Sequence, residues 1–310
     1  EESTRLAALQ TGALDTGEMA VQSLAVLREQ EGFEFTSAPD AGQLQFHLHG
    51  NFYSVDRPGY KPDRAWVSSN GDINSPEWAN AVKVRLAMAI SIDRDLIVDE
   101  LLGGQARAQH YFGDAGNSVL DPLKAENPEP YAFDLPRAKA LLAEAGYENG
   151  FDLPISCYTR GVPSDIQVCE AVAGMWETLG INTQVSKLPY ATLRPLMFDR
   201  NMEVIHVHGL GTYPEPMALW PNGTYVKGGW NAGFEHPILD DILDRALVEA
   251  NQEKRWKITR EASVFMREHV THIPLYVPDV IYPAGPKIAP WPLGGGAKNI
   301  IHNLELIRPR

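Results

Sequence analysis

Apolar residues recur at helical spacing between residues 81 and 102, and charged residues occupy positions between them. This pattern predicts one amphipathic helix over residues 81–102. Gly103 and Gly104 follow the last apolar position and are expected to end the helix, because glycine adopts the conformation common at helix C-termini. The apolar set is Val84, Met88, Ile92, Leu96 and Ile97, and the polar set is Arg85, Asp93, Arg94 and Asp95.

A second helix is predicted over residues 135–145 from the signals at its ends. Asp134 is placed as an N-cap, and Pro136 lies in the first turn, where its missing N–H costs nothing. Gly146 suits the left-handed position that follows a helix C-terminus.

The rest of the chain alternates between strand and helix patterns. Strands separated by helical segments need crossover connections, which indicates an α/β fold with a mainly parallel or mixed sheet covered by helices. A loop rich in Gly, Pro, Asn and Asp over residues 50–75 is the expected domain border. The predicted helices are 4–10, 20–29, 165–179, 190–199, 237–250 and 253–269, and the predicted strands are 14–16, 33–37, 44–49, 151–158, 181–188, 203–208, 273–277 and 303–307.

Composition narrows the class of protein. A chain of 310 residues, of which 44% are hydrophobic, can bury a large core and is long enough for more than one domain. With 40 acidic against 27 basic residues, its net charge of −13 repels nucleic acid and anionic lipid headgroups. No apolar run approaches the roughly 20 residues that a membrane-spanning helix needs. We therefore expect a globular protein that binds no nucleic acid.

Two segments resemble one protein family in their residue sequences and in the order in which they occur along the chain. Residues 84–104, VRLAMAISIDRDLIVDELLGG, and residues 131–147, YAFDLPRAKALLAEAGY, resemble the most recognisable run of the family 5 extracellular solute-binding proteins. These are the peptide, nickel and oligosaccharide receptors of ABC importers. The resemblance implies an α/β fold of the type 2 periplasmic binding protein kind, with two lobes whose mixed sheets are flanked by helices, one lobe being incomplete.

The resemblance also implies a division of the chain into lobes. Residues 81–275 would form the C-terminal α/β lobe, residues 1–80 would form part of the first lobe, and residues 276–310 would return to it. Residues 5–15 resemble a family segment, "R-x-x-A-L-x-x-G-x-x-D", that lies well inside the mature protein. We therefore expect an N-terminal part to be missing, with exposed strand edges near Leu14 and Leu44.

The function implied by the resemblance is that of the substrate-binding component of an ABC transporter, with no chemistry and no cofactor of its own. It would capture a peptide or peptide-like solute between two lobes, act as a monomer and deliver the solute to the permease subunits. An oligosaccharide, an opine or a metal chelate is the alternative within the family, and an α/β hydrolase is the alternative outside it. The implied location is periplasmic, or extracellular with a lipid anchor on the missing N-terminal part.

Three candidate ligand-binding residues follow from the resemblance. Arg160 ends a predicted strand where peptide-binding relatives can hold the ligand carboxylate, a task that suits the bidentate guanidinium group. Residues 209–216, GLGTYPEP, resemble the family loop "G-W-x-x-D-x-x-D-P", whose first acid binds free amino groups. Thr212 stands at or near that place, which argues against an α-amino ligand. Glu215 matches the later acid, and for it a structural role is the expected one.

Further candidates come from loops that contain aromatic residues. Trp230 and Asn231 resemble the family segment "n-w-s-G-y-s-n-p-e-f-D", which passes the hinge side of the cleft. Tyr213 lies beside Thr212, and its ring could stack on a sugar or on a peptide side chain. Packing over the hydrophobic core is the alternative role for each ring.

Histidines form two H-x-H pairs, His47 with His49 and His206 with His208, each on a predicted strand where alternate residues share a face. Two imidazoles on one face can bind Zn, Ni or Cu, but two ligands are too few for a structural site unless the pairs meet. We expect no metal here. The expected role of these histidines is in the core or in the lining of the cleft, with His49 as a ligand-binding candidate.

Cys157 and Cys169, the two cysteines of the chain, stand twelve residues apart in no metal or redox motif. In an oxidising compartment they could pair, and closing so short a loop would contribute about 3 kcal/mol in the chain-entropy model. The alternative, which we expect, is two buried thiols.

Overall fold

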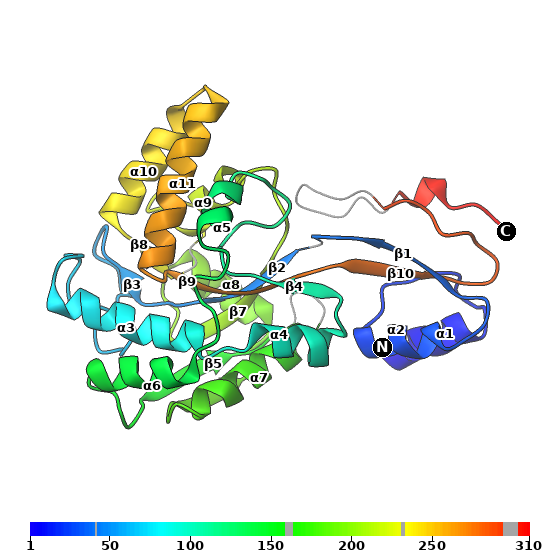
Figure 1. Cartoon of the computed structure of the whole chain (residues 1–310), viewed down its shortest axis with the longest axis horizontal. Helices are drawn as coiled ribbons and strands as arrows, with labels where there is room; N and C mark the ends of the chain where they lie inside the picture. The colour runs from blue at the N-terminus through cyan, green and yellow to red at the C-terminus, as the bar shows by residue number, and fades with distance from the viewer. Residues whose placement is uncertain (41, 159–163, 231–232, 294–302) are drawn as a thin grey trace.

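The computed structural model describes residues 1–40, 42–158, 164–230, 233–293 and 303–310. Figure 1 shows a main body with the largest sheet and most of the helices, and a small unit where both chain ends lie. The small unit contains helices α1 (Glu2–Gln10) and α2 (Val21–Arg28) and the antiparallel strands β1 (Glu34–Ala38) and β10 (Val280–Ala284). Leu9, Met19, Leu24 and Leu27 form its hydrophobic cluster.

The central sheet of the main body has six strands in the order β4-β9-β2-β7-β5-β6. β5 lies parallel to β6 and β7, whereas β2 is antiparallel to β7 and β9, and β4 is antiparallel to β9. This mixed sheet confirms the predicted α/β class. The strands are β2 (Gln43–His47), β4 (Ala106–Ala108), β5 (Asp152–Ser156), β6 (Asn182–Ser186), β7 (Ile205–Leu210) and β9 (His272–Pro278).

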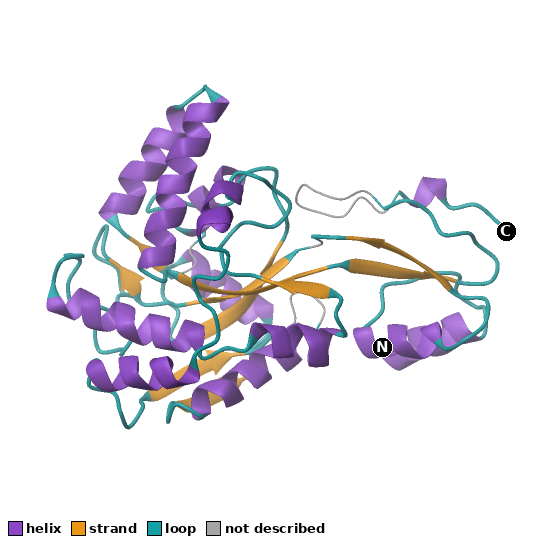
Figure 2. Ribbon diagram, in the orientation of Figure 1, coloured by secondary structure: helices purple, strands orange, loops and turns teal. Residues whose placement is uncertain are grey.

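Helices cover the sheet, as Figure 2 shows. The helices α3 (Pro76–Ile90), α6 (Leu135–Glu144) and α7 (Asp165–Glu177) share the largest hydrophobic core with the apolar face of the strands. In this core the rings of Phe46 and Trp176 lie 4.8 Å apart. The indole Nε1 of Trp176 donates a hydrogen bond of 2.9 Å to the Met88 carbonyl, which joins α7 to α3.

A second core lies under the paired helices α10 (Pro237–Val248) and α11 (Gln252–Glu268), which stand up from the sheet in Figure 1. The short parallel strands β3 (Asn51–Phe52) and β8 (Phe234–Glu235) lie beside it. The Glu235 side chain is fully buried, and its carboxylate accepts from Arg57 Nε at 3.0 Å and from Arg200 Nε at 2.5 Å. Further helices are α5 (Asp121–Glu126), α8 (Tyr190–Phe198), α9 (Trp220–Gly223) and the 3₁₀ turns η2 (Pro216–Ala218) and η3 (Leu304–Leu306).

The predicted end signals of α6 are confirmed. The Asp134 carboxylate accepts a hydrogen bond of 2.9 Å from the backbone N–H of Arg137, and Pro136 lies in the first turn. Gly146 follows the helix with φ +85°, a conformation that side chains other than glycine's rarely adopt.

The single helix predicted over residues 81–102 is wrong. The structure has α3, then a break, then the short α4 (Arg94–Leu96), which continues as the π-helical turn η1 (Ile97–Leu101). The Asp93 carboxylate caps the second piece by accepting from the Leu96 N–H at 2.9 Å. A local N-cap therefore interrupts an apolar pattern that is periodic through the break.

Arg85 and Arg94 were placed on the polar face of that helix, yet both are buried, at 0% and 3% exposure. Arg94 donates to the carbonyls of Ala89, Pro274 and Tyr131 at 2.9 to 3.1 Å. It therefore supplies hydrogen bonds to carbonyls at the end of α3 and in two neighbouring segments, where a cation also interacts favourably with the helix dipole.

The domain border expected at residues 50–75 does not coincide with a change in packing. Leu44, Phe46 and Leu48 lie in the same core as α3 and α7, and Trp66 and Val67 join them. β2 pairs on both sides, with β7 and β9, so the exposed edge expected near Leu44 is wrong. The chain passes from small unit to main body between β1 and β2, and it returns between β9 and β10.

Two predicted strands are also wrong. Residues 14–16 form no strand, and Leu14 is 41% exposed. Residues 303–307 contain the turn η3 instead of a strand. Four observed strands, β3, β4, β8 and β10, were not predicted, because strands of two to five residues carry little periodic pattern.

Cys157 and Cys169 form a disulfide bond with their Cα atoms 5.7 Å apart, so the expectation of two buried thiols is wrong. Both residues are fully buried in the main core, as expected. The bond joins the end of β5 to the first half of α7, because the strand and the helix that follows it bring these positions within disulfide reach.

Candidate functional site

Strands β2, β7 and β9 gather histidines on one face of the central sheet. Residues directly opposite one another on antiparallel strands share a face, and the register places His47 opposite both His206 and His272. The ring of His47 lies 5.0 Å from that of His206, 5.4 Å from that of His272 and 4.8 Å from that of His208. The opposite face carries the core residues Leu44, Phe46, Ile205, Val207 and Ile273.

His49 joins this cluster just beyond the end of β2. Its Nε2 atom lies 3.0 Å from Nδ1 of His206, within hydrogen-bonding distance. All five histidines, which we call the histidine face (His47, His49, His206, His208 and His272), are at most 3% exposed. The two H-x-H pairs of the sequence therefore meet across the β2–β7 ladder.

Burial keeps the imidazoles of His47, His49, His206 and His272 neutral. It lowers the pKa of His49 and of His272 to about 3. Burial, together with the neighbouring imidazoles, lowers the pKa of His47 and His206 well below the usual range. Neutral imidazole carries a lone pair that can accept a hydrogen bond or bind a metal.

An open hollow of about 470 Å³ adjoins the histidine face at the C-terminal end of β7. Tyr190 and Arg194 of α8, together with Tyr213 and Trp230, provide its larger side chains, and His208 reaches it from the sheet. The Trp230 ring lies 5.5 Å from that of His208. Aromatic walls with an arginine and an imidazole suit an organic solute that has both apolar and charged groups.

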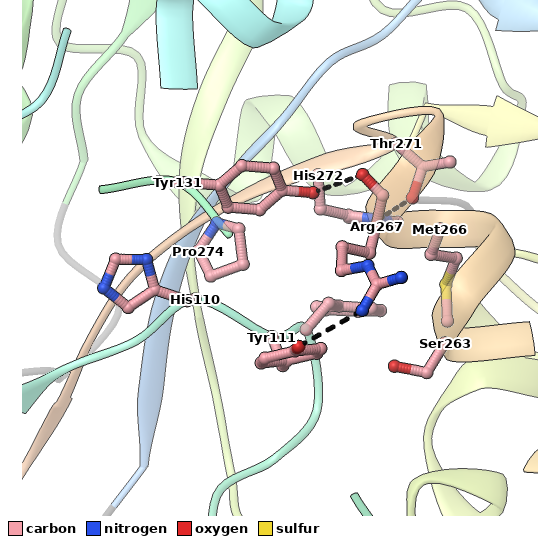
Figure 3. Close-up of a pocket in the computed structure, with 10 residues that line it drawn as sticks. His110, Tyr111, Tyr131, Ser263, Met266, Arg267, Thr271, His272 and Pro274 are labelled. Atoms are coloured by element: carbon pink, nitrogen blue, oxygen red, sulfur yellow. Dashed lines mark hydrogen bonds between the residues drawn. The ribbon is translucent and has the colours of Figure 1, made fainter. Parts of the chain in front are cut away.

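A second pocket, shown in Figure 3, lies behind His272 and is lined by His110, Tyr131 and Arg267 among others. The Tyr131 hydroxyl donates to the Arg267 carbonyl at 2.8 Å and helps to enclose it. Its volume of about 10 Å³ is room for one water molecule at most, so this pocket is too small for a solute.

The structure brings some of the predicted site residues together. Tyr213 and Trp230 both line the hollow. Thr212 and His49 are both 3% exposed, and neither is among the residues that line the hollow. Arg160 and Asn231 lie outside the described residues.

Glu215 has structural contacts, in line with the role expected for it. Its carboxylate accepts from Arg255 Nε at 3.1 Å and from Trp256 Nε1 at 2.8 Å, both in the first turns of α11. These bonds tie the loop after β7 to α11. Glu215 is not among the residues that line the hollow.

Tyr190 and Arg194, which also line the hollow, were not among the candidates predicted from the sequence. They lie four positions apart on α8 and therefore share one face of the helix. The four-residue spacing is visible in the sequence. The orientation of α8, which turns this face toward the end of β7, is not.

Residues 1–231 match the family described as "Bacterial extracellular solute-binding proteins, family 5 Middle". The match covers more than half of the chain, so the protein belongs to this family, as its resemblance implied. Over 218 residues the chain is 27% identical to the periplasmic murein peptide-binding protein MppA of Escherichia coli, a match that covers 67% of this chain and 38% of that protein. Over 245 residues it is 29% identical to a putative ABC transporter peptide-binding protein of Brucella ovis, covering 75% of this chain and 44% of the other.

Solved structures support the same fold. The crystal structure of NikA from Brucella suis in complex with Fe(III)-EDTA superposes with a TM-score of 0.76 at 15% identity, covering 100% of this chain and 60% of that one. A dipeptide-binding protein from Pseudoalteromonas in complex with Met-Leu gives a TM-score of 0.72 at 18% identity, covering 100% and 57%. The fold is therefore that of the type 2 periplasmic binding proteins.

The chain spans about two fifths of the length of the curated relatives it matches. In the described part of the chain, no helix is long and apolar enough to cross a bilayer.

Proposed function

We propose that the protein to which this chain belongs is the solute receptor of an ABC importer, and that it takes a peptide or peptide-like solute into the hollow at the end of β7. In this proposal the protein binds without chemistry, works as a monomer in the periplasm or on a lipid anchor outside the cell, and passes the solute to membrane permease subunits. Binding-protein relatives named for peptides and for the periplasm support it.

The observation that carries the proposal is the lining of the hollow. Tyr190, Tyr213 and Trp230 offer ring surfaces to side chains, and Arg194 is an exposed guanidinium that can pair with a carboxylate. A peptide presents both kinds of group within a few ångströms of each other, and its backbone amides can bond to groups of the loop that follows β7.

Calorimetry with a panel of two- to five-residue peptides tests the proposal. We expect Trp230→Ala to weaken binding at least about fivefold, because a lost ring contact is worth about 1 kcal/mol or more. Phe133→Ala is the matched control, since Phe133 is 51% exposed and lies outside the hollow. The proposal fails if no peptide binds, or if both variants bind every peptide as the unmodified protein does.

Arg194 is the arginine we expect to hold a ligand carboxylate, with Arg160 as a second candidate from the family resemblance. Loss of a charge-assisted bond costs about 1.5 to 3 kcal/mol, or roughly ten- to hundredfold in the dissociation constant. Arg194→Gln and Arg160→Ala, measured with a peptide and with its C-terminal amide, separate the two. The arginine that holds the carboxylate is the one whose replacement abolishes the preference for the free acid.

Thr212 leads us to expect no preference for a free α-amino group, because a hydroxyl cannot offset the cost of desolvating an ammonium. Competition between a peptide and its N-acetylated form measures this. A free amine that binds more than tenfold tighter, about 1.4 kcal/mol, would contradict it.

Within the family, an oligosaccharide, an opine or a metal chelate is the competing class of solute, and the same calorimetry with these compounds decides between them. The competing function is hydrolysis. Turnover of any peptide or glycoside in the panel, measured by release of product, would replace the receptor proposal with an enzyme.

A further inference from the structure

Three side chains of the histidine face offer nitrogen atoms that converge. One ring nitrogen each from His47, His49 and His206 can be chosen so that all three lie within 4.8 Å of one another. His47 and His206 stand opposite each other in the β2–β7 register, and His49 follows at the end of β2. Rigid strands therefore position at least two of these rings, and strands hold a site more accurately than loops do.

Several nitrogens of this group have no hydrogen-bond partner in the described part of the chain. They are Nδ1 of His47, Nδ1 of His49 and Nε2 of His206, and each residue is at least 97% buried. A buried polar atom without a partner is costly, and native structures contain few of them. These three nitrogens are a different set from Nε2 of His49 and Nδ1 of His206, which face each other at 3.0 Å, so they show that this cluster is short of polar partners but do not themselves identify the ligand atoms.

We propose that His47, His49 and His206 form a binding site for one divalent first-row transition metal ion, with Zn²⁺, Ni²⁺ and Cu²⁺ as the candidates. Imidazole is a preferred ligand of these three ions. The site goes beyond the capture of a solute, because the three ligands all come from the chain and bind the ion without one.

The distance between the closest two nitrogens fits such an ion. Two nitrogens that each lie about 2.1 Å from a metal are about 3.0 Å apart at a right angle and about 3.4 Å apart at the tetrahedral angle. His49 Nε2 and His206 Nδ1 are 3.0 Å apart. The widest separation in the group, up to 4.8 Å, has to shorten when the ion binds.

The open hollow lies next to the proposed metal site and offers the ion a route of entry. His47 stacks on His208 and on Trp230, at ring distances of 4.8 and 5.8 Å, and both of these residues line the open hollow. Three protein ligands also leave at least one coordination position of the ion for a water molecule or another donor.

Calorimetric titration of the chelator-treated, untagged protein with Zn²⁺, Ni²⁺ and Cu²⁺ tests the site. We expect one ion to bind per chain, and each of His47→Gln, His49→Gln and His206→Gln to weaken binding at least about tenfold. Loss of a direct ligand costs no less than loss of a second-shell partner. The matched control is His236→Gln, a buried histidine whose Nε2 contacts the Gly71 carbonyl outside the cluster. It should bind the ion as the unmodified protein does.

Electron paramagnetic resonance of the unmodified protein with one equivalent of Cu²⁺ keeps the test independent of how the variants fold. We expect hyperfine coupling to imidazole nitrogens. The proposal is overturned if none of the three ions binds at one per chain, if the bound copper shows no nitrogen coupling, or if His206→Gln binds as tightly as the control. Because no solute is present, failure here leaves the receptor proposal untouched, and failure to bind peptides leaves the metal site untouched.

Discussion

Breaking the disulfide between Cys157 and Cys169 should lower the stability of the folded chain by a calculable amount. The chain contains two cysteines, so a reductant can act on no other bond. Reduction leaves both sulfur atoms in the core, where they are fully buried, and therefore removes the cross-link without opening a cavity.

The size of the effect follows from the length of the closed loop. With a separation of 12 residues, the chain-entropy model gives about 3 kcal/mol at 25 °C. A chain of 310 residues has an unfolding entropy of about 0.65 kcal/mol/K, at about 2.1 cal/mol/K per residue. The midpoint of thermal unfolding should therefore fall by about 4 to 5 °C.

Differential scanning calorimetry of oxidised protein, and of protein reduced in denaturant and refolded with reductant present, measures the difference. The double variant Cys157→Ala and Cys169→Ala should be insensitive to reductant. It should also lie below the reduced protein by a further ~1 to 3 kcal/mol, because two buried sulfur atoms are lost. Equal midpoints within 1 °C for oxidised and reduced protein would refute the reasoning.

Three other predictions concern the frame of the fold. Burial and Arg85 lower the pKa of His269 to about 4. His269 therefore contributes to the free energy of unfolding above pH 6.5, and this contribution is lost as the pH falls toward 4. Urea unfolding at each pH measures the loss. Gly150→Ala should cost about 3 kcal/mol or more in the same assay, because φ is +75° and the new Cβ would lie 1.8 Å from the Gly180 carbonyl oxygen. Glu235→Gln should cost about 3 to 5 kcal/mol, because it leaves two largely buried arginines without their counter-charge.

Each of these has a matched control. His269→Gln should make the loss of stability between pH 6.5 and 4 smaller, leaving the part that comes from other buried histidines such as His49 and His272, and an unchanged slope would rule out a contribution from His269. Gly146→Ala has positive φ but no atom within 4 Å of the new Cβ, so it should cost clearly less than Gly150→Ala, and equal losses would contradict the clash. Glu261→Gln breaks an exposed ion pair worth about 0.5 kcal/mol, and a loss as large as that of Glu235→Gln would contradict the role of burial.

Local signals in the sequence predicted most helices well. Residues 135–145 and 165–179 were expected as helices, and the structure has α6 and α7 within two residues of those bounds. N-caps, first-turn prolines and C-terminal glycines act on their own helix ends, so they are readable without knowledge of the fold. The break after α3 carried such a signal in Asp93, but the periodic apolar residues on both sides outweighed it.

Local sequence signals did not predict properties that depend on contacts between distant segments of the chain. Arg85 and Arg94 look like surface residues in the helix pattern, yet both are buried. Arg85 donates to the carbonyls of His269 and Trp66, and Arg94 donates to the carbonyls of Pro274 in β9 and of Tyr131, all of which come from other segments of the chain. The meeting of the two H-x-H pairs depends on the register between β2 and β7, which lie about 160 residues apart. A metal site requires that the two pairs meet, and residue types and spacing alone do not determine whether they do.

The way the chain enters and leaves the main body has a practical consequence. The body runs without interruption from β2 to β9, and Leu44 at its beginning lies opposite Tyr276 near its end. The small unit is the part assembled from two distant pieces of chain. Residues 43–278 are therefore a cassette whose two ends emerge side by side on adjacent strands, and such a segment can be grafted into a surface loop of another protein with little cost in chain entropy.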